Sequence, residues 1–449
     1  MAFDDRRQFA IDVVRRLRGA GFEALWAGGC VRDLIAGREP SDFDVATDAT
    51  PERVMALFRR TVPVGVSFGV VRVLGPEGAG EVEVATFRSD GEYHDGRRPE
   101  SVRFGTPRED AARRDFTING MFLDPISGAV IDFVGGRDDL QAGVLRAIGD
   151  PAERFAEDKL RLLRAVRFAA RFDLTIEPPT RAALVAMAEQ VRVVAAERIA
   201  DELRKMLVHP SRARALDLAL EVGLVAALWP ELAAMKGLFQ GKPAQPRGDL
   251  WDHTLLVLEN LPPAPSFPLA LAALLHDVGK PRTRGLHDGR ATFYNHEQVG
   301  ARIADRIARD LRLSNADRRR VVWLVEHHQY LGEARKMREA KLKRILSTPG
   351  IDDLLALHRA DALATDGDTA EVDYCEWFRR DQPTGPLDPP PLVTGHDLQR
   401  HGLTPGPRFA VILDAVREAQ LDRLVSSKRD ALDWIDRELA AGRLLPKES

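Results

Sequence analysis

The chain has 449 residues, too many for one compact core, so about two to four domains are expected. Lysine and arginine number 65 against 68 aspartate and glutamate, a formal net charge of −3. Bulk charge therefore gives no argument for a nucleic-acid partner, which would need a local basic surface. The only two cysteines, Cys30 and Cys375, exclude a disulfide framework and a CxxC metal clip.

The N-terminal segment predicts neither a secretory signal nor a membrane anchor. Residues 1–19 are amphipathic and carry charges where a signal peptide needs an apolar stretch. No apolar run of about 18 residues or more occurs, so no membrane span is expected. We therefore expect a cytoplasmic protein, and the sequence gives no indication of its oligomeric state.

Residues 1–135 predict a small α/β head. An amphipathic helix over 5–19 precedes a buried strand in EALWAGG, a short helix in CVRDLIAG and a second strand in DFDVAT. TPERVMALFRR begins like a helix, and GVVRVLG and EVEVATFR are further strand-like runs. Strands that alternate with helices and then pair as hairpins indicate an α/β fold.

The remainder of the chain is predicted to be helical. A neck over 136–235 has almost continuous helical periodicity, and a loop with prolines and glycines leads into a helical body over 236–385. The proline-rich DQPTGPLDPPPLVTG precedes a tail, 386–449, with helices over 409–420 and 428–441. The expected fold class is therefore multidomain α+β.

The stretch AGGCVRDLIAGREPSDFDVAT contains a candidate metal site. Residues two apart in a strand point to the same side, so Asp42 and Asp44 present two carboxylates together while Phe43 turns to the core. A divalent cation relieves the repulsion between them, and oxygen ligands suit Mg²⁺ in phosphoryl transfer. Glu81 and Glu83 share one face of EVEVATFR, so either can supply a third carboxylate.

The same stretch contains a candidate phosphate site. The backbone amides of Gly28 and Gly29 are not obstructed by side chains, and Arg32 adds charge-assisted hydrogen bonds. A glycine pair or an Asp-X-Asp alone is more typical of a solvated loop. A glycine pair followed by an Asp-X-Asp that lies in a strand is a far more specific indication of a nucleotide site than either motif alone.

This stretch resembles the first motif of the tRNA nucleotidyltransferase/poly(A) polymerase family of bacteria and eukaryotes, within the polymerase β-like superfamily. ARRDFTINGMF, RFAEDKLRLLRAVRFAAR and AERIADELRK resemble further motifs in the family's order. Gly120 replaces the usual alanine, and Lys159 stands where proline is common. The resemblance implies a polymerase β-like nucleotidyltransferase head that holds Mg²⁺ on Asp42 and Asp44.

The run EDKLRLLRAVRF predicts a helix with a charged residue at every third position: Asp158, Arg161, Arg164 and Arg167. A solvated basic face with one ion pair is the simpler interpretation, but the arginines share the helix with core residues. An aspartate accepts hydrogen bonds and an arginine donates them, so together they match the base edge that cytosine and adenine share.

The resemblance assigns a role to each of these groups. It implies that Asp158 and Arg161 select CTP and ATP, with Arg164 and Arg167 supporting the nucleotide. It also implies that Arg114 and Asp115 contact the triphosphate and the ribose.

The implied activity is template-independent addition of CCA to the 3′ end of tRNA from CTP and ATP, with release of pyrophosphate. Residues 88–104 have the length of a loop found in relatives that add all of CCA or the terminal A. VPVGVSFGVVRV departs from the GRRFR-like run of polyadenylating relatives. CCA addition is therefore favoured over A-only addition and poly(A) synthesis. An inert RNA-binding head is disfavoured by its intact motifs.

A second group of metal-ligand residues lies in the body. LALAALLHDVGK ends in the pair His276-Asp277, and the other candidate ligands are His253, His296, His328 and Asp361. Their order resembles the HD phosphohydrolase superfamily, which implies a transition metal or Mg²⁺ and hydrolysis of phosphoesters such as 2′,3′-cyclic phosphates. His327 is an alternative to His328. Two other possibilities are a degenerate domain retained for packing and tRNA contact, and an HD hydrolase with an inactive head.

The tail segment VTGHDLQRHGLTPGPRFAVILDAVREAQL resembles the family's C-terminal segment. That resemblance implies a phosphate-facing turn at His401–Gly402 and Pro405–Pro407, before Phe409, and contact with the tRNA elbow. A helix start rich in proline and glycine needs no ligand, so the turn also has a purely structural interpretation.

Overall fold

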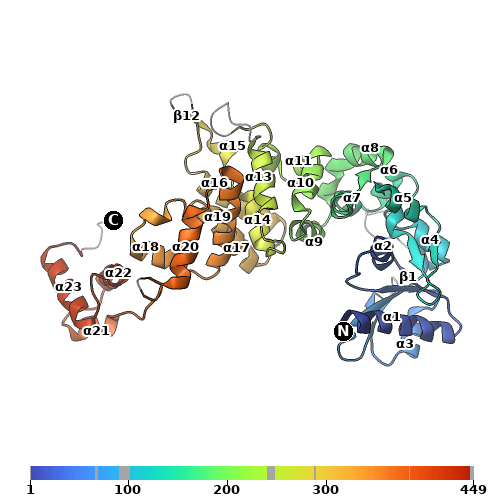
Figure 1. Cartoon of the computed structure of the whole chain (residues 1–449), viewed down its shortest axis with the longest axis horizontal. Coiled ribbons are helices and arrows are strands. Elements are labelled where there is room, and N and C mark those ends of the chain that lie inside the picture. Colours follow the sequence, from blue (N-terminus) through green and yellow to red (C-terminus); the bar gives the residue numbers. More distant parts are fainter. Residues whose placement is uncertain are drawn as a thin grey trace. The chain divides into compact units, whose positions relative to one another are not determined.

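The computed structural model describes residues 2–65, 69–90, 102–239, 248–287, 290–383 and 385–444. It divides into two compact units, Met1–Ala233 with Asp310–Arg312, and Ala234–Arg309 with Leu313–Ser449 (Figure 1). The predicted multidomain α+β class, with a sheet-containing head and helical remainder, is confirmed. The four-part division stays a prediction. No helix in the described ranges is both long and apolar enough to cross a membrane.

A mixed sheet of seven strands forms the head, in the order β3-β4-β5-β2-β1-β8-β9. Its strands are β1 Ala24–Ala27, β2 Asp44–Thr47, β3 Thr61–Gly65, β4 Val70–Leu74, β5 Glu81–Thr86, β8 Met121–Leu123 and β9 Val130–Asp132. Within this sheet, β2 and β5 are the only described strands that pair in parallel, and their register sets Asp44 opposite Glu83. β6 Arg88–Asp90 and β7 Val102–Phe104 form a separate hairpin.

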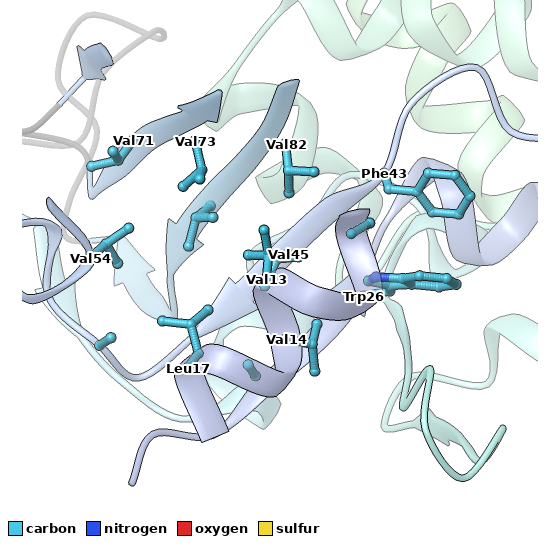
Figure 2. Packing of buried hydrophobic residues seen from close by; sticks show 14 of the residues in the cluster. Val13, Val14, Leu17, Trp26, Phe43, Val45, Val54, Val71, Val73 and Val82 are labelled. Carbon is cyan, nitrogen blue, oxygen red and sulfur yellow. The ribbon is translucent and has the colours of Figure 1, made fainter. Parts of the chain in front are cut away.

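Helix α1, Ala2–Gly19, packs on one face of this sheet. Its buried residues Val13, Val14 and Leu17 meet the valines of β2, β4 and β5 (Figure 2). At the edge of this core the rings of Trp26 and Phe43 lie 4.6 Å apart. Phe43 is thus turned into the core, as its position between two aspartates predicts.

The opposite face of the sheet carries the polar site. Leu25, Ala27, Ala46, Phe87 and Phe122 form a smaller buried cluster there. Because successive residues of a strand face opposite sides, Asp44 and Glu83 lie on this second face, away from α1.

Further helices complete the first unit. They are α2 Gly29–Ile35, α3 Pro51–Leu57, α4 Pro107–Ala112, α5 Gly136–Ala142, α6 Pro151–Glu157, α7 Leu160–Phe172, α8 Pro178–Met187, α9 Ala196–Leu207, α10 Arg212–Glu221, α11 Leu224–Leu228 and α12 Pro230–Ala233. A short parallel pair, β10 Val144–Leu145 with β11 Thr175–Ile176, interrupts the neck, whose helical periodicity gave no sign of it.

The prediction of one helix through EDKLRLLR is wrong at its start. α6 ends at Glu157, Asp158 has extended backbone (φ −144°, ψ 104°), and α7 begins at Leu160. The carboxylate of Asp158 accepts the backbone N–H of Leu160 at 3.1 Å. This bond satisfies an otherwise unpaired donor of the first turn of α7, which favours a helix start at this point.

The second unit is helical. Its helices are α13 Leu250–Glu259, α14 Phe267–Leu275, α15 Lys280–Thr283, α16 His296–Asp310, α17 Asn315–His327, α18 Glu339–Leu346, α19 Ile351–Thr365, α20 Ala370–Asp381, α21 Gly395–Arg400, α22 Arg408–Leu421 and α23 Lys428–Ala440, with a hairpin of β12 Gly285–His287 and β13 Arg290–Thr292. α14 is buried along its whole length, which matches its uniformly apolar sequence. α22 and α23 are the tail helices that the sequence predicts. Cys30 and Cys375 are buried and unpaired.

A close backbone approach positions the segment that follows α4. A Cβ added at Gly136, the first residue of α5, would lie 2.1 Å from the carbonyl oxygen of Thr117. The hydroxyl of Thr117 also donates to Asp139 of α5 at 2.7 Å. α5 therefore lies directly against the short 3-10 helix Thr117–Asn119, which leads into β8.

We expect Gly136→Ala to destabilise the first unit, because its methyl group would displace the backbone of Thr117. An overpacked site of this kind costs about 2–3 kcal/mol, a fall of roughly 5–10 °C in the midpoint of thermal unfolding. Gly19→Ala is the matched control, because a Cβ at Gly19 meets nothing within 4 Å. Equal midpoints for the two variants in differential scanning calorimetry would contradict the packing argument.

Candidate functional site

A cavity of about 540 Å³ opens in the first unit on the face of the sheet opposite α1. Its walls come from β2, β5, the start of α2, the segment after α4, and α7. The predicted site residues that line it are Gly28, Gly29, Arg32, Asp44, Glu83, Arg114, Asp115, Asp158, Arg161, Arg164 and Arg167. Asp42 is not among the lining residues. The fold thus gathers distant motifs around one cavity.

Acidic groups gather where β2 and β5 begin. Asp44 and Glu83 are register partners on the parallel strands, and Asp42 lies two residues before Asp44. Desolvation, together with the charges of Glu83 and Asp42, raises the pKa of Asp44 to about 7. Desolvation and the charge of Asp42 also raise the pKa of Glu83, although the Arg72 guanidinium opposes them. This all-oxygen donor set with unrelieved repulsion fits a divalent cation.

Glu81 lies at the start of β5, where it pairs with Arg72 at 3.1 Å. The register of the sheet sets Glu83, and not Glu81, opposite Asp44. Of the two glutamates that share this face, Glu83 is therefore the one placed to join the aspartates.

The backbone amide of Gly28 already has a partner in the folded chain. Its N–H donates to the carbonyl of Met121 at 3.3 Å, so this amide is engaged in the sheet rather than left to bind phosphate. Its φ of 70° with ψ of −122° favours glycine strongly, and a Cβ there would lie 2.7 Å from Nη1 of Arg114. Gly28 therefore lets a guanidinium approach the backbone. Gly29, the first residue of α2, also lines the cavity.

Two arginines are held rigidly at the same wall. Nη1 of Arg32 donates to Oδ1 of Asn119 at 2.6 Å, and its other nitrogens donate to Asp33 at 2.7 and 2.9 Å. Arg114 donates to Asp110 at 2.9 and 3.1 Å and to the carbonyl of Asn119 at 3.1 Å. Both guanidinium groups thus have fixed orientations toward a cavity that is suited to an anion.

Asp115 is fully engaged with the opposite wall. Its carboxylate pairs with Arg164 at 2.6 Å and accepts the side-chain amide of Asn119 at 2.9 Å. Burial by itself would raise the pKa of Asp115, but Arg164 and Asn119 hold it at about 2. Asn119 therefore touches Arg32, Arg114 and Asp115. The sequence did not single out Asn119, although it lies within RRDFTIN.

The side chains of Asp158 and Arg161 do not pair with each other, although the N–H of Arg161 donates to the backbone carbonyl of Asp158 at 3.0 Å. The carboxylate of Asp158 forms a bidentate pair with Arg198 of α9 at 2.8 and 3.1 Å. Arg161 donates to Glu157 at 2.5 Å and to the carbonyls of Arg154 and Arg113. Neither Arg198 nor Glu157 was predicted as a site residue, although both lie within family motifs.

The rest of the arginine row is not a solvated face. Arg161 and Arg167 are 8% and 7% exposed. Arg167 pairs at 2.5 Å with Glu202, a buried residue of α9. Arg164 pairs with Asp115. The simpler interpretation of this row as a solvated basic face is therefore wrong, because carboxylates neutralise Arg161, Arg164 and Arg167.

The predicted ligands of the second unit converge on Asp277. Nε2 of His276, His296, His328 and His253 lies 3.2, 3.3, 3.6 and 3.8 Å from its carboxylate. Nε2 of His253 is also 3.1 Å from Asp361. All six predicted residues thus share one cluster, although they come from five separate segments of the chain: His253, His276, Asp277, His296, His328 and Asp361.

Hydrogen bonding prepares this cluster for a metal ion. Nδ1 of His276, His296 and His328 each lies 2.8 Å from a backbone carbonyl, which leaves Nε2 directed at the centre. Among the described residues, Oδ1 of Asp277 and Nε2 of His296 and His328 are buried without a hydrogen-bond partner. Buried groups of this kind are costly unless a ligand satisfies them, so the donor set fits a divalent metal.

His327 is placed differently from His328. Its ring stacks on Trp323 at 5.0 Å and it contacts Tyr330, away from the cluster. A second close approach of backbones supports the cluster, since a Cβ at Gly279 would lie 2.1 Å from the carbonyl of His296.

The predicted tail turn is exposed. Nε2 of His401 lies 2.9 Å from Asp436 of α23, and Phe409 packs partly into the tail core. Most of the predicted loop 88–104 lies outside the described residues. The phosphate-facing role of the tail turn and the contribution of that loop stay predictions.

Three regions of the chain match models of known protein families. Residues 24–146 match the poly A polymerase head domain, 173–236 the probable RNA and SrmB-binding site of polymerase A, and 251–366 the HD domain. The CCA-adding enzyme of Geobacillus stearothermophilus is 43% identical over 227 residues, 50% of this chain and 55% of that protein. The chain thus matches about half the length of that relative.

Two further relatives match over nearly the whole chain. The CCA-adding enzyme of Lactobacillus helveticus is 30% identical over 436 residues, which are 94% of this chain and 95% of that protein. The crystal structure of the Bacillus stearothermophilus CCA-adding enzyme in complex with CTP superposes with a TM-score of 0.74 at 26% identity, covering 97% and 98% of the two chains. With its motifs in order around one cavity, the chain belongs to the family of the CCA-adding enzymes.

Proposed function

We propose that the first unit is a template-independent nucleotidyltransferase that adds CCA to the 3′ end of tRNA from CTP and ATP. The observation that carries this proposal is the placement of the Asp44–Glu83 pair in a cavity also lined by Asp158 and Arg161. The names of the relatives, and the CTP complex among them, support it. A chain that acts on tRNA ends is expected in the cytoplasm.

The carboxylates and the arginines of the cavity have different roles in the proposed reaction. Asp42 and Asp44 would hold Mg²⁺, which when bound polarises the phosphate and the attacking hydroxyl. Arg32 and Arg114 donate hydrogen bonds to the triphosphate, and Asp115 accepts one from the ribose. The 3′ oxygen of the RNA bonds to the α-phosphorus, pyrophosphate leaves with the bridging oxygen, and Glu83 accepts the hydroxyl proton.

Base selection takes place at the opposite wall. Asp158 accepts a hydrogen bond from the exocyclic amino group of cytosine or adenine, and Arg161 donates one to the adjacent ring nitrogen. Uracil and guanine present the reverse pattern and leave both groups unsatisfied. Arg198 and Glu157 hold these side chains until a base arrives.

Primer-extension assays separate the competing activities. tRNAs that lack one, two or all three terminal nucleotides are incubated with each nucleoside triphosphate. Ordered addition to all of them supports CCA synthesis. Addition only to tRNA ending in CC would identify an A-adding enzyme, and long A tracts a poly(A) polymerase.

The variant Glu83→Gln tests the carboxylate site. We expect its kcat for CMP incorporation to fall by about 10²-fold or more, because the proton acceptor next to Asp44 is lost. Glu81→Gln, two residues away on the same strand face, is the matched control and should retain kcat within about twofold. Similar losses in both variants, measured with radiolabelled CTP, would remove Glu83 from the mechanism.

Asp158→Asn tests base selection, because the amide presents a donor in place of one acceptor oxygen. We expect kcat/KM for CTP and ATP to fall by about 10²-fold while misincorporation of UTP rises. Competition assays with mixed nucleotides measure the ratio directly. Unchanged selectivity would place base recognition elsewhere.

The HD cluster supports a second activity in the other unit. We propose that the six-residue cluster holds a divalent metal and hydrolyses phosphoesters such as the 2′,3′-cyclic phosphate of an RNA end. The unpartnered Nε2 atoms of His296 and His328 favour this proposal over a cluster retained for packing. Such ends lack a free 3′ hydroxyl. Attack of water on the phosphorus with cleavage of its bond to O3′ would leave a 2′-phosphate and the free 3′ hydroxyl that addition needs.

His328→Gln should lower the metal content and remove cyclic-phosphate hydrolysis, since it deletes one imidazole from the cluster. His327→Gln changes the neighbouring residue and should retain both properties. Metal per chain is measured by mass spectrometry after dialysis, alongside hydrolysis of a labelled cyclic-phosphate end. Loss of metal in the His327 variant alone would reverse the assignment.

A further inference from the structure

Two arginines from distant parts of the sequence meet beyond the end of α7. Arg38 follows α2, and Arg171 lies in the last turn of α7. Their guanidinium carbons lie 4.9 and 5.6 Å from the ring centroid of Phe172. Nη1 of Arg38 donates to the backbone carbonyl of Arg171 at 3.2 Å. We call this pair the Arg38–Arg171 patch.

The arginines of the patch differ from the other arginines of this region because no carboxylate pairs with them in the part of the chain that the structure describes. Arg32, Arg164 and Arg167 each pair with a carboxylate. Among the described residues, neither Arg38 nor Arg171 has an ion-pair partner, and Glu39 makes no ion pair with its neighbour. The patch thus carries positive charge that the protein does not neutralise.

His209 lies near both positive charges. Burial lowers the pKa of His209, and the positive charges of Arg171 and Arg38 lower it further, with smaller contributions from Arg212 and Arg167. The C-terminus of α7 accounts for one contact of each arginine, because Arg171 lies in its last turn and Nη1 of Arg38 donates to the carbonyl of Arg171. Among the described residues, no carboxylate pairs with the remaining N–H groups of either guanidinium, and these can donate to an anion.

The position of the patch indicates which anion it binds. Arg171 lines the nucleotide cavity, whereas Arg38 and His209 do not. Arg171 lies ten residues beyond Arg161 on α7, which corresponds to about 15 Å along the helix. A ligand that contacts both arginines of the patch must therefore extend out of the cavity, as an RNA strand does and a nucleoside triphosphate held inside it does not.

We propose that the Arg38–Arg171 patch is a phosphate subsite that grips the backbone of the RNA strand whose 3′ end enters the cavity. This inference rests on the proposed nucleotidyltransferase function. Each guanidinium offers several donors to phosphate oxygens. Contact with the backbone alone carries no base preference, so this subsite would position the strand without selecting its sequence.

The variants Arg38→Gln and Arg171→Gln test the subsite. Binding of fluorescent tRNA lacking its CCA end is measured by anisotropy over a range of salt, without nucleotide. Each variant should weaken binding by roughly three- to tenfold at low salt and reduce the slope of log K against log salt by about 0.7–0.9. Arg181→Gln, an exposed arginine of α8 paired with Glu221, is the matched control and should match the unmodified chain.

Two further measurements distinguish a phosphate contact from a stacking role and from a nucleotide contact. Arg171→Lys keeps the charge and should retain RNA affinity within about twofold, which a purely structural stacking role would not predict. CTP binding to the free chain should be unchanged in Arg38→Gln, because Arg38 does not line the nucleotide cavity. Unaltered RNA affinity in both glutamine variants, or weaker CTP binding in Arg38→Gln with RNA affinity unchanged, would overturn the subsite. Failure of the proposed function would differ, because the unmodified chain would then bind RNA without extending it.

Discussion

The ion pair between Arg164 and Asp115 is the interaction on which the rest of the cavity depends. It joins α7 to the segment that follows α4, so it fixes the helical wall relative to the sheet. Asp115 is only 7% exposed, and loss of its partner would leave an uncompensated buried charge, at a cost of about 3–5 kcal/mol. Asn119 extends this link to Arg32 and Arg114.

The parts of the fold that could be predicted from the sequence are those in which the local residue pattern matches the burial of the residues in the folded chain. Alternation in EVEVATFR gives a strand with buried valines, and Gly37 closes the short helix after the glycine pair. The break at Asp158 was missed because the helical periodicity continues through it, although an aspartate that accepts the N–H two residues on is a local signal for a helix start. The pair β10–β11 was missed because neither two-residue strand carries a pattern of its own.

In the candidate site too, local motifs identified residues of the cavity but not the partners of those residues. Motif residues were named correctly as neighbours in space, since the fold brings Asp44, Glu83 and Asp158 to one cavity. Their partners were not named, because spacing along the chain does not show which carboxylate neutralises which arginine. The Gly28 amide was assigned to phosphate because its pairing with Met121 exists only in the folded sheet.

The bidentate pair of Asp158 with Arg198, and the pair of Arg161 with Glu157, give partners within the protein to the two side chains proposed to read the base. The protein therefore contains its own competitor for the base. The binding free energy that an incoming base gains is only the difference between the hydrogen bonds it makes and those it displaces. A mismatched base would have to break both pairs without replacing them. Because every base that reaches this wall must displace the same two pairs, that cost cancels in the difference of binding free energy between a correct and an incorrect base. The internal pairs would therefore lower the affinity for every nucleotide, and discrimination would depend on the new hydrogen bonds that each base makes with Asp158 and Arg161.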